Sequence, residues 1–157
     1  MSDIREIKNQ LKIIKIIHIS LISGVILFFI VAVMIIQSNK VSGNKELDSI
    51  FTIVVPAYGL LMMYFSRTIF NLLVSKFSAG SNLSEKIAKF RLAKIICWAL
   101  VESACLFALV ATLLTSNYLY VVVFIFLFGY FFMLRLSKQS LKIELQLSPE
   151  EMNLIFN

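Results

Sequence analysis

Four polar side chains lie inside long apolar stretches of this sequence, where an ionisable group is costly and usually has a partner or a role. Glu102 stands within the apolar run 95–115, while Arg67, His18 and Tyr130 each belong to a different run. A carboxylate beside a guanidinium forms an ion pair, and an imidazole or a phenol nearby adds hydrogen bonds. Such a group can relay a proton or an ion, or line a polar pocket. We predict a buried polar cluster built on a Glu102–Arg67 ion pair; in the alternative, the pair only fixes helix register and Arg67 reaches toward the lipid headgroups.

The elements that must position these side chains are membrane-spanning helices. The chain has 157 residues, of which 59% are hydrophobic and 15% charged, with a mean hydropathy of +0.88. The apolar residues fall into four runs, at 13–36, 50–74, 95–115 and 118–134. A helix of about 20 apolar residues crosses a hydrocarbon core of about 30 Å, and continuous rather than alternating runs exclude a barrel. We predict an all-α integral membrane four-helix bundle made of two antiparallel helical hairpins, with 1–157 as a single domain.

Similar depth in the membrane is what would bring the four polar residues together. At a rise of about 1.5 Å per residue, Glu102 lies about 10 Å from the inner end of its run. Arg67 comes near the inner end of the second run, and His18 lies about one turn into the first. Tyr130 approaches the same level in the fourth run. All four are therefore expected in the same half of the bilayer.

Basic residues predict the orientation of the bundle, because loops rich in Lys and Arg stay in the cytoplasm. They cluster in the N-terminal segment, around the middle connection and in the C-terminal tail: Arg5, Lys8, Lys12, Lys15, Arg67, Lys76, Lys86, Lys89, Arg91, Lys94, Arg135, Lys138 and Lys142. The first connection holds only Lys40 and Lys45. We predict cytoplasmic N- and C-termini in the plasma (inner) membrane. The net charge of +6 follows from this rule and needs no nucleic-acid partner.

Both ends of the chain carry amphipathic patterns. Apolar residues recur at helical spacing before the first run, at Ile4, Ile7, Leu11 and Ile14, which predicts a short amphipathic helix in the cytoplasmic interface. In the cytoplasmic tail 135–157, residues 141–147 fit a strand by alternation and a helix by spacing, and we favour the helix. Ser148 and Pro149 then predict the start of a short final helix. Its apolar positions require the bilayer surface or a partner protein to cover them.

A stripe of small residues runs along the third apolar segment, nearly opposite Glu102. Its members are Ala93, Cys97, Ala104, Ala108, Ala111 and Thr115. Small side chains allow two membrane helices to approach closely. If this stripe packs within the chain, Glu102 faces a subunit interface; if Glu102 faces the interior, the stripe forms the oligomer contact. The sequence leaves both open.

The stretch 85–115, EKIAKFRLAKIICWALVESACLFALVATLLT, resembles the second helix of the proteolipid c subunits of rotary ATPases. Members of that family pass from a basic cytoplasmic loop into an apolar helix that carries an essential carboxylate. Ala99 and Leu100 precede Glu102 as in the family pattern, with Cys105 in place of its alanine and Phe107 nearby. The resemblance covers about a fifth of the chain. It implies that Glu102 binds the translocated proton or cation.

The remaining sequence holds no motif of a catalytic or metal site. There is no H-E-x-x-H, no C-x-x-C and no Walker loop, and one histidine with two cysteines cannot build a typical metal centre. We therefore expect no enzyme activity and no cofactor. The expected function is a non-catalytic accessory or scaffold subunit of a membrane assembly, which contacts the lipid bilayer and either a protein partner or further copies of itself. The alternative is a proton- or cation-translocating proteolipid-like subunit that uses Glu102.

Overall fold

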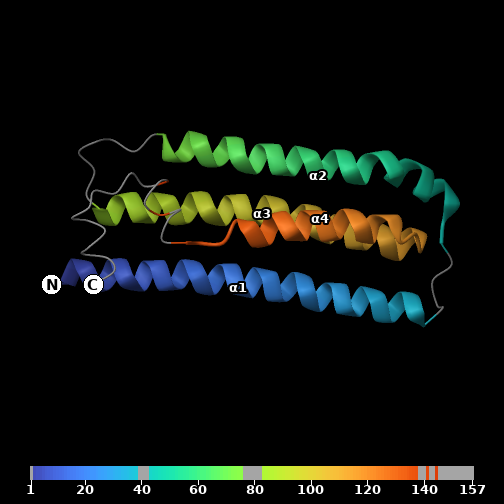
Figure 1. Ribbon diagram of the computed structural model, residues 1–157, viewed down its shortest axis with the longest axis horizontal. Coiled ribbons are helices and arrows are strands. Elements are labelled where there is room, and N and C mark those ends of the chain that lie inside the picture. Colours follow the sequence, from blue (N-terminus) through green and yellow to red (C-terminus); the bar gives the residue numbers. More distant parts are fainter. Residues whose placement is uncertain (1, 39–42, 76–82, 138–140, 142–143, 145–157) are drawn as a thin grey trace.

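The chain folds into four α-helices over the residues that its computed structural model describes, which are 2–38, 43–75, 83–137, 141 and 144. In chain order these are α1 (Ser2–Gln37), α2 (Lys45–Val74), α3 (Leu83–Thr115) and α4 (Leu119–Met133). This part of the chain contains no strand (Figure 1). The predicted all-α four-helix architecture is confirmed.

Three of these helices are long and apolar enough to cross a membrane, and the fourth is shorter. α1, α2 and α3 meet the length and composition that a span requires. α4 has 15 residues, which gives a length of about 22 Å against a hydrocarbon core of about 30 Å. α1 has 36 residues, about 54 Å, so it extends well beyond such a core. The protein is therefore a membrane protein whose helices differ in length.

The third helix is the centre of the bundle. α3 packs against each of the other three helices, while α1 and α2 lie on opposite sides of the α3–α4 pair (Figure 1). Every member of the small-residue stripe of α3 is buried: Ala93, Cys97, Ala104, Ala108, Ala111 and Thr115. Small side chains there let the neighbouring helices approach α3 closely. Of the two arrangements that the sequence leaves open, the structure has the stripe inside the chain.

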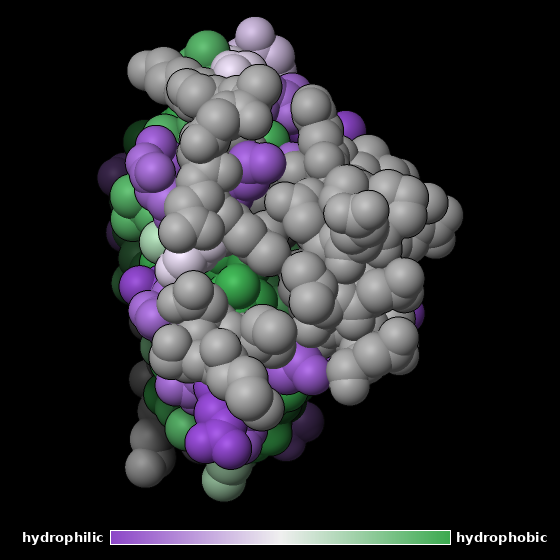
Figure 2. Space-filling model, turned by 90° about the vertical axis from the view of Figure 1, so that its left-hand side faces the viewer, coloured by the Kyte–Doolittle hydropathy of each residue, from purple (hydrophilic) through white to green (hydrophobic). Residues whose placement is uncertain are grey.

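One end of the bundle is basic. At this basic end α1 and α3 begin and α2 ends, and hydrophilic side chains are spread over its surface (Figure 2). The predicted N-terminal amphipathic helix is not a separate element but the first turns of α1. Its apolar residues Ile7, Leu11 and Ile14 belong to the same buried cluster as Ile87 and Phe90 of α3. The amphipathic face is thus covered by protein, because α1 and α3 run side by side beyond the level where α4 ends.

The tail after α4 also packs on the chain itself. Leu141 and Glu144 have helical backbone conformation, and the Leu141 N–H donates to the Ser137 carbonyl at 3.0 Å. Leu141 is only 2% exposed and belongs to the core, so neither the bilayer nor a partner is needed to cover it. The two described residues of 141–147 therefore agree with the predicted helix. The rest of that segment and the predicted final helix after Ser148 lie outside the described residues.

The opposite end, here called the hairpin end, is closed by backbone and cap contacts. Ser116 adopts a left-handed backbone conformation with φ of 55°, which turns the chain from α3 into α4. Asn44 caps α2 by accepting from two backbone N–H groups, and its own N–H donates to the Leu114 carbonyl at 3.2 Å. Gly43 lies so close to the Thr115 carbonyl that a Cβ would not fit. The start of α2 is therefore docked directly on the α3–α4 turn.

A carboxylate joins α2 to α4 at the hairpin end. The Tyr120 hydroxyl donates to Asp48 Oδ1 at 2.7 Å, and Asn117 Nδ2 donates to the two Asp48 carboxylate oxygens at 2.9 and 3.2 Å. Thr52 Oγ1 donates to the Asp48 carbonyl at 2.8 Å and lies 3.3 Å from the Tyr120 hydroxyl. Hydrogen bonds to a charged acceptor are the stronger kind. This group holds two helices together where they share little apolar contact.

Replacing Tyr120 by Phe tests this connection. The change removes one hydroxyl from a fully buried ring and leaves the ring in place. We expect a loss of about 1.5–3 kcal/mol in the free energy of unfolding, the usual net contribution of a hydrogen bond to a charged group. Tyr118→Phe is the matched control, because Tyr118 is 62% exposed and should lose almost nothing. Denaturation in mixed detergent micelles measures both; equal stability of the two variants would contradict the role assigned to Tyr120.

Candidate functional site

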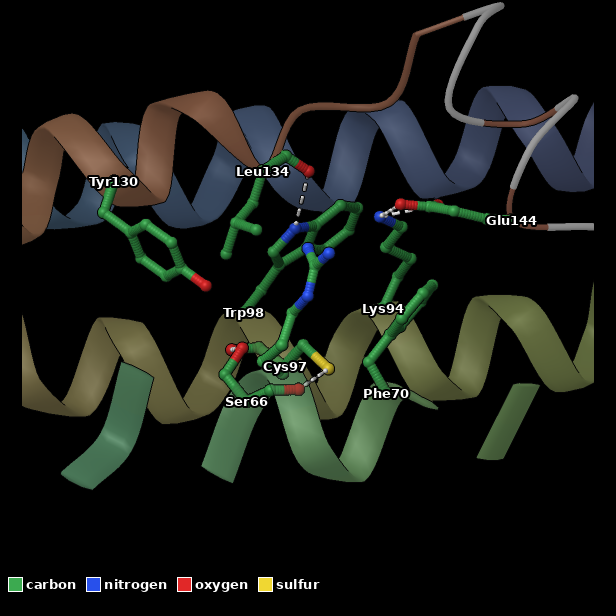
Figure 3. Close-up of a pocket in the computed structure, with 9 residues that line it drawn as sticks. Ser66, Phe70, Lys94, Cys97, Trp98, Tyr130, Leu134 and Glu144 are labelled. Carbon is green, nitrogen blue, oxygen red and sulfur yellow. Dashed lines mark hydrogen bonds and ion pairs between the residues drawn. The ribbon is translucent and has the colours of Figure 1, made fainter. Parts of the chain in front are cut away.

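The polar groups of the basic end converge on one turn of α3, from Lys94 to Trp98. Side chains from α2 and α4, together with Glu144 of the tail, surround this turn (Figure 3). The turn carries Lys94, Cys97 and Trp98, which are all buried. Each of these three residues binds a different part of the chain.

Lys94 forms a buried ion pair with the tail. Its Nζ lies 3.0 Å from Glu144 Oε1 and 2.9 Å from Oε2 (Figure 3). The side chain of Lys94 is 5% exposed and that of Glu144 23%. Nζ also lies 4.6 Å from the centre of the Phe70 ring and 5.4 Å from that of Phe90, within the range of cation–π attraction. A carboxylate and two aromatic faces thus replace the water around the ammonium group.

Cys97 joins α3 to α2 through a reciprocal pair of hydrogen bonds. The Cys97 thiol donates to the Ser66 carbonyl at 3.1 Å, and the Ser66 hydroxyl donates to the Cys97 carbonyl at 3.3 Å. Ser66 is one of the few buried residues of α2. Two small side chains at this point allow the backbones to approach closely enough for each to reach the other's carbonyl. The contact sets the register between the two helices.

Trp98 joins α3 to α4 and α1. Its indole N–H donates to the Leu134 carbonyl at 3.2 Å, just after α4 ends (Figure 3). On its other side the His18 ring of α1 stacks on the indole with ring centres 4.3 Å apart and planes at 23°. The Phe131 ring meets His18 edge-on at 5.3 Å. Trp98 is fully buried, so this single side chain holds parts of three helices around it.

A small polar cavity lies beside this turn. Arg67, Ser66 and Tyr130 line it together with Lys94 and Glu144, and its volume is about 20 Å³. A water molecule needs at least about 10–15 Å³ measured in this way, so the cavity has room for about one. Such a space suits a water or a small ion between charged groups. It is far too small for an organic substrate.

The predicted polar cluster is only partly assembled in the structure. Arg67 and Tyr130 line the same cavity, and His18 stacks on Trp98 in its wall. Glu102 does not line this cavity and forms no ion pair with Arg67. The predicted Glu102–Arg67 pair is therefore wrong.

Helix register explains the error. Because Ser66 is level with Cys97, Arg67 lies near the level of that residue, and Glu102 lies five residues further along α3. Five residues correspond to about 7.5 Å of helix. Both side chains lie in the same half of the span, but this offset along the helix axis keeps them apart.

Glu102 instead stands on the outward side of α3. It lies at the edge of that side: Ala99 and Leu106, on one flank, are exposed and partly exposed, whereas Trp98 and Cys105, on the other, are buried, and Glu102 itself is partly exposed. Among the residues that the structure describes, it has no hydrogen-bond or ion-pair partner. Lys94 lies eight residues earlier, about 12 Å toward the basic end. The carboxylate is therefore well inside the span, on the surface of the bundle and without a partner from its own described chain.

Sequence reasoning missed the ion pair that the structure contains. The sequence pattern presents Lys94 as one of the basic residues that flank a span, and Glu144 as one position of the tail segment 141–147. A signal was present, because Lys94 falls on the apolar spacing of Ile87, Phe90 and Val101, which are all buried. Glu144 is also the only acidic residue between 102 and 150. A cation on a buried stripe needs a carboxylate, and Glu144 is the next one in the chain after Glu102.

Comparison with the models of known protein families, with curated proteins and with solved structures finds no match to this chain. The resemblance of 85–115 to the proteolipid c subunits therefore stays a prediction. The site defines a membrane bundle closed at its basic end by a buried ion pair, with a second, partly exposed carboxylate on its side.

A pair of double-mutant cycles tests the two carboxylates. Removing either Lys94 (Lys94→Met) or Glu144 (Glu144→Gln) leaves the other group buried without a partner, which is strongly destabilising. We expect a coupling energy of about 0.5–3 kcal/mol between these two changes in the free energy of unfolding. The matched cycle of Arg67→Met with Glu102→Gln should be additive, since these side chains do not touch. Coupling in the second cycle but not in the first would refute the assignment.

Proposed function

We propose that this chain is a non-catalytic subunit of a membrane protein assembly and that the outward side of α3 around Glu102 is where another chain packs. The observation that carries the proposal is the unpartnered position of Glu102. A charged carboxylate inside a span costs about 2.5–3.5 kcal/mol on insertion scales. Partners from its own chain would offset that cost, but the described residues provide none. A polar or basic group on a second chain, or another copy of this one, fills that role.

The basic end supports a structural rather than a catalytic role. Lys94 and Glu144 neutralise each other, and Cys97 and Trp98 use their polar hydrogens in contacts between helices. The adjoining cavity has room for about one water molecule. All of these groups hold the helices together, and none of them faces a space that a substrate would occupy.

We further propose that the basic end faces the cytoplasm and that the membrane is the plasma (inner) membrane. The start of α1, the end of α2 and the start of α3 meet at this end, and all of them carry Lys or Arg. The hairpin end holds few cations and is closed by the carboxylate of Asp48. Short basic segments are retained on the cytoplasmic side.

A second candidate function rests on the same carboxylate. Glu102 is partly exposed on the side of the bundle, at a depth that a lipid or a neighbouring subunit reaches. In the c subunits that 85–115 resembles, the ion-carrying carboxylate is placed in this way. A proton- or cation-translocating subunit is therefore the alternative that an experiment must separate from a packing role.

Crosslinking and carboxylate labelling together separate the two candidates. A photo-reactive amino acid at Ala99, which is exposed on the Glu102 side, should give a protein adduct in native membranes. The same group at Leu27 of α1, which is 64% exposed, is the matched control and should react mainly with lipid. Dicyclohexylcarbodiimide should leave Glu102 unmodified in the assembly because its carboxylate is paired there, and Glu102→Gln supplies the blank.

Two results would overturn the packing role. Lipid adducts alone at both positions would show that no protein covers the outward side of α3. Rapid labelling of Glu102 by the carbodiimide, together with loss of proton or cation flux in Glu102→Gln, would establish the translocating alternative.

A further inference from the structure

A groove at the basic end has cations at its outer end and apolar walls deeper in the membrane, which matches the headgroup and acyl chains of an anionic lipid. It lies between α1 and the end of α4 and has a volume of about 270 Å³. Ile19, Ile22 and Phe132 form its apolar walls, while Lys15 and Arg135 supply its cations. Both cations are exposed, as are Ile19 and Phe132, so the groove opens on the outside of the bundle. Among the residues that the structure describes, no acidic side chain lines it.

The positions of these residues along the helices match the interface of a bilayer. Lys15 stands near the start of the apolar part of α1, and Ile19 and Ile22 follow one and two turns deeper. Arg135 comes directly after α4, and its guanidinium lies 5.8 Å from the centre of the Phe132 ring. The cations therefore lie at the level of the lipid headgroups, and the apolar walls lie at the level of the acyl chains.

The wall of the groove also contains the buried ring of His18. His18 is 4% exposed, and its Nε2 has no hydrogen-bond partner among the described residues. The ring is held in place by the Trp98 stack and the edge of Phe131. His18 therefore forms a rigid part of the wall between the apolar residues and the cations of the groove.

We propose that this groove is a specific site for one phospholipid with an anionic headgroup. The phosphate is placed between Lys15 and Arg135, and an acyl chain follows Ile19, Ile22 and Phe132. Basic pockets between membrane helices that bind acidic headgroups are an established form of lipid recognition.

Retention of lipid measures the site directly. The full chain is reconstituted in nanodiscs of equal parts phosphatidylcholine and phosphatidylglycerol and released for native mass spectrometry. We expect one phosphatidylglycerol to be retained in preference to phosphatidylcholine. The double change Lys15→Gln with Arg135→Gln should reduce that retention about tenfold or more, because each cation contributes to the free energy of binding an anionic lipid. Lys8→Gln with Lys12→Gln removes the same charge from exposed positions outside the groove and should change it little.

A charge-conserving variant tests the acyl part of the site. Ile19→Trp fills the groove from an exposed position and should also reduce retention, whereas Leu27→Trp, exposed elsewhere on α1, should not. The proposal is overturned if both glutamine pairs reduce retention equally, because general surface attraction then explains the binding. It is also overturned if Ile19→Trp retains the lipid as the unchanged chain does, or if excess inorganic phosphate displaces it, because a free anion then suffices.

Discussion

The burial of Trp98 is the constraint on which the rest of the bundle depends. Membrane helices gain little from apolar burial against each other, so their arrangement relies on close packing and on polar contacts. In this chain both kinds of contact are concentrated on one turn of α3. The His18 ring stacks on one face of the indole, and the indole N–H donates a hydrogen bond to the Leu134 carbonyl. Cys97, one residue earlier, exchanges hydrogen bonds with Ser66. One turn thereby fixes the positions of α1, α2 and α4.

The same arrangement explains how the chain divides its charges. Where α4 ends, α1 and α3 continue together, and Leu141 and Glu144 of the tail pack on them in its place. The ion pair with Lys94 can be buried there because Phe70 and Phe90 cover the ammonium group. At the hairpin end the Asp48 carboxylate also joins helices, but there the neutral donors Asn117 and Tyr120 stabilise its charge. Glu102 is different from both carboxylates, since nothing in the described chain meets it.

Much of the architecture follows from the sequence, but the pairing of side chains does not. Run lengths predict the helices, and the spacing of Ala104, Ala108 and Ala111 predicts a close helix contact without saying whether it lies inside the chain. Depth can be counted along a helix, and this places Arg67 and Glu102 in the same half of the bilayer. Their contact also requires the rotation and register of α2 against α3, which depend on Ser66 meeting Cys97. The same limit applies to Glu144, whose partner is 50 residues away in the chain.

The most direct test of this account is the access of lipid to Trp98. It is the only tryptophan of the chain and is fully buried among α1, α3 and α4, so its fluorescence reports on this turn alone. In bilayers that contain brominated phosphatidylcholine we predict little quenching. The double change Trp98→Phe with Ala99→Trp moves the indole to the next position of α3, which is exposed. This variant should show strong quenching. Strong quenching of Trp98 in the unchanged chain would show that the helices do not close around it and would contradict the central claim.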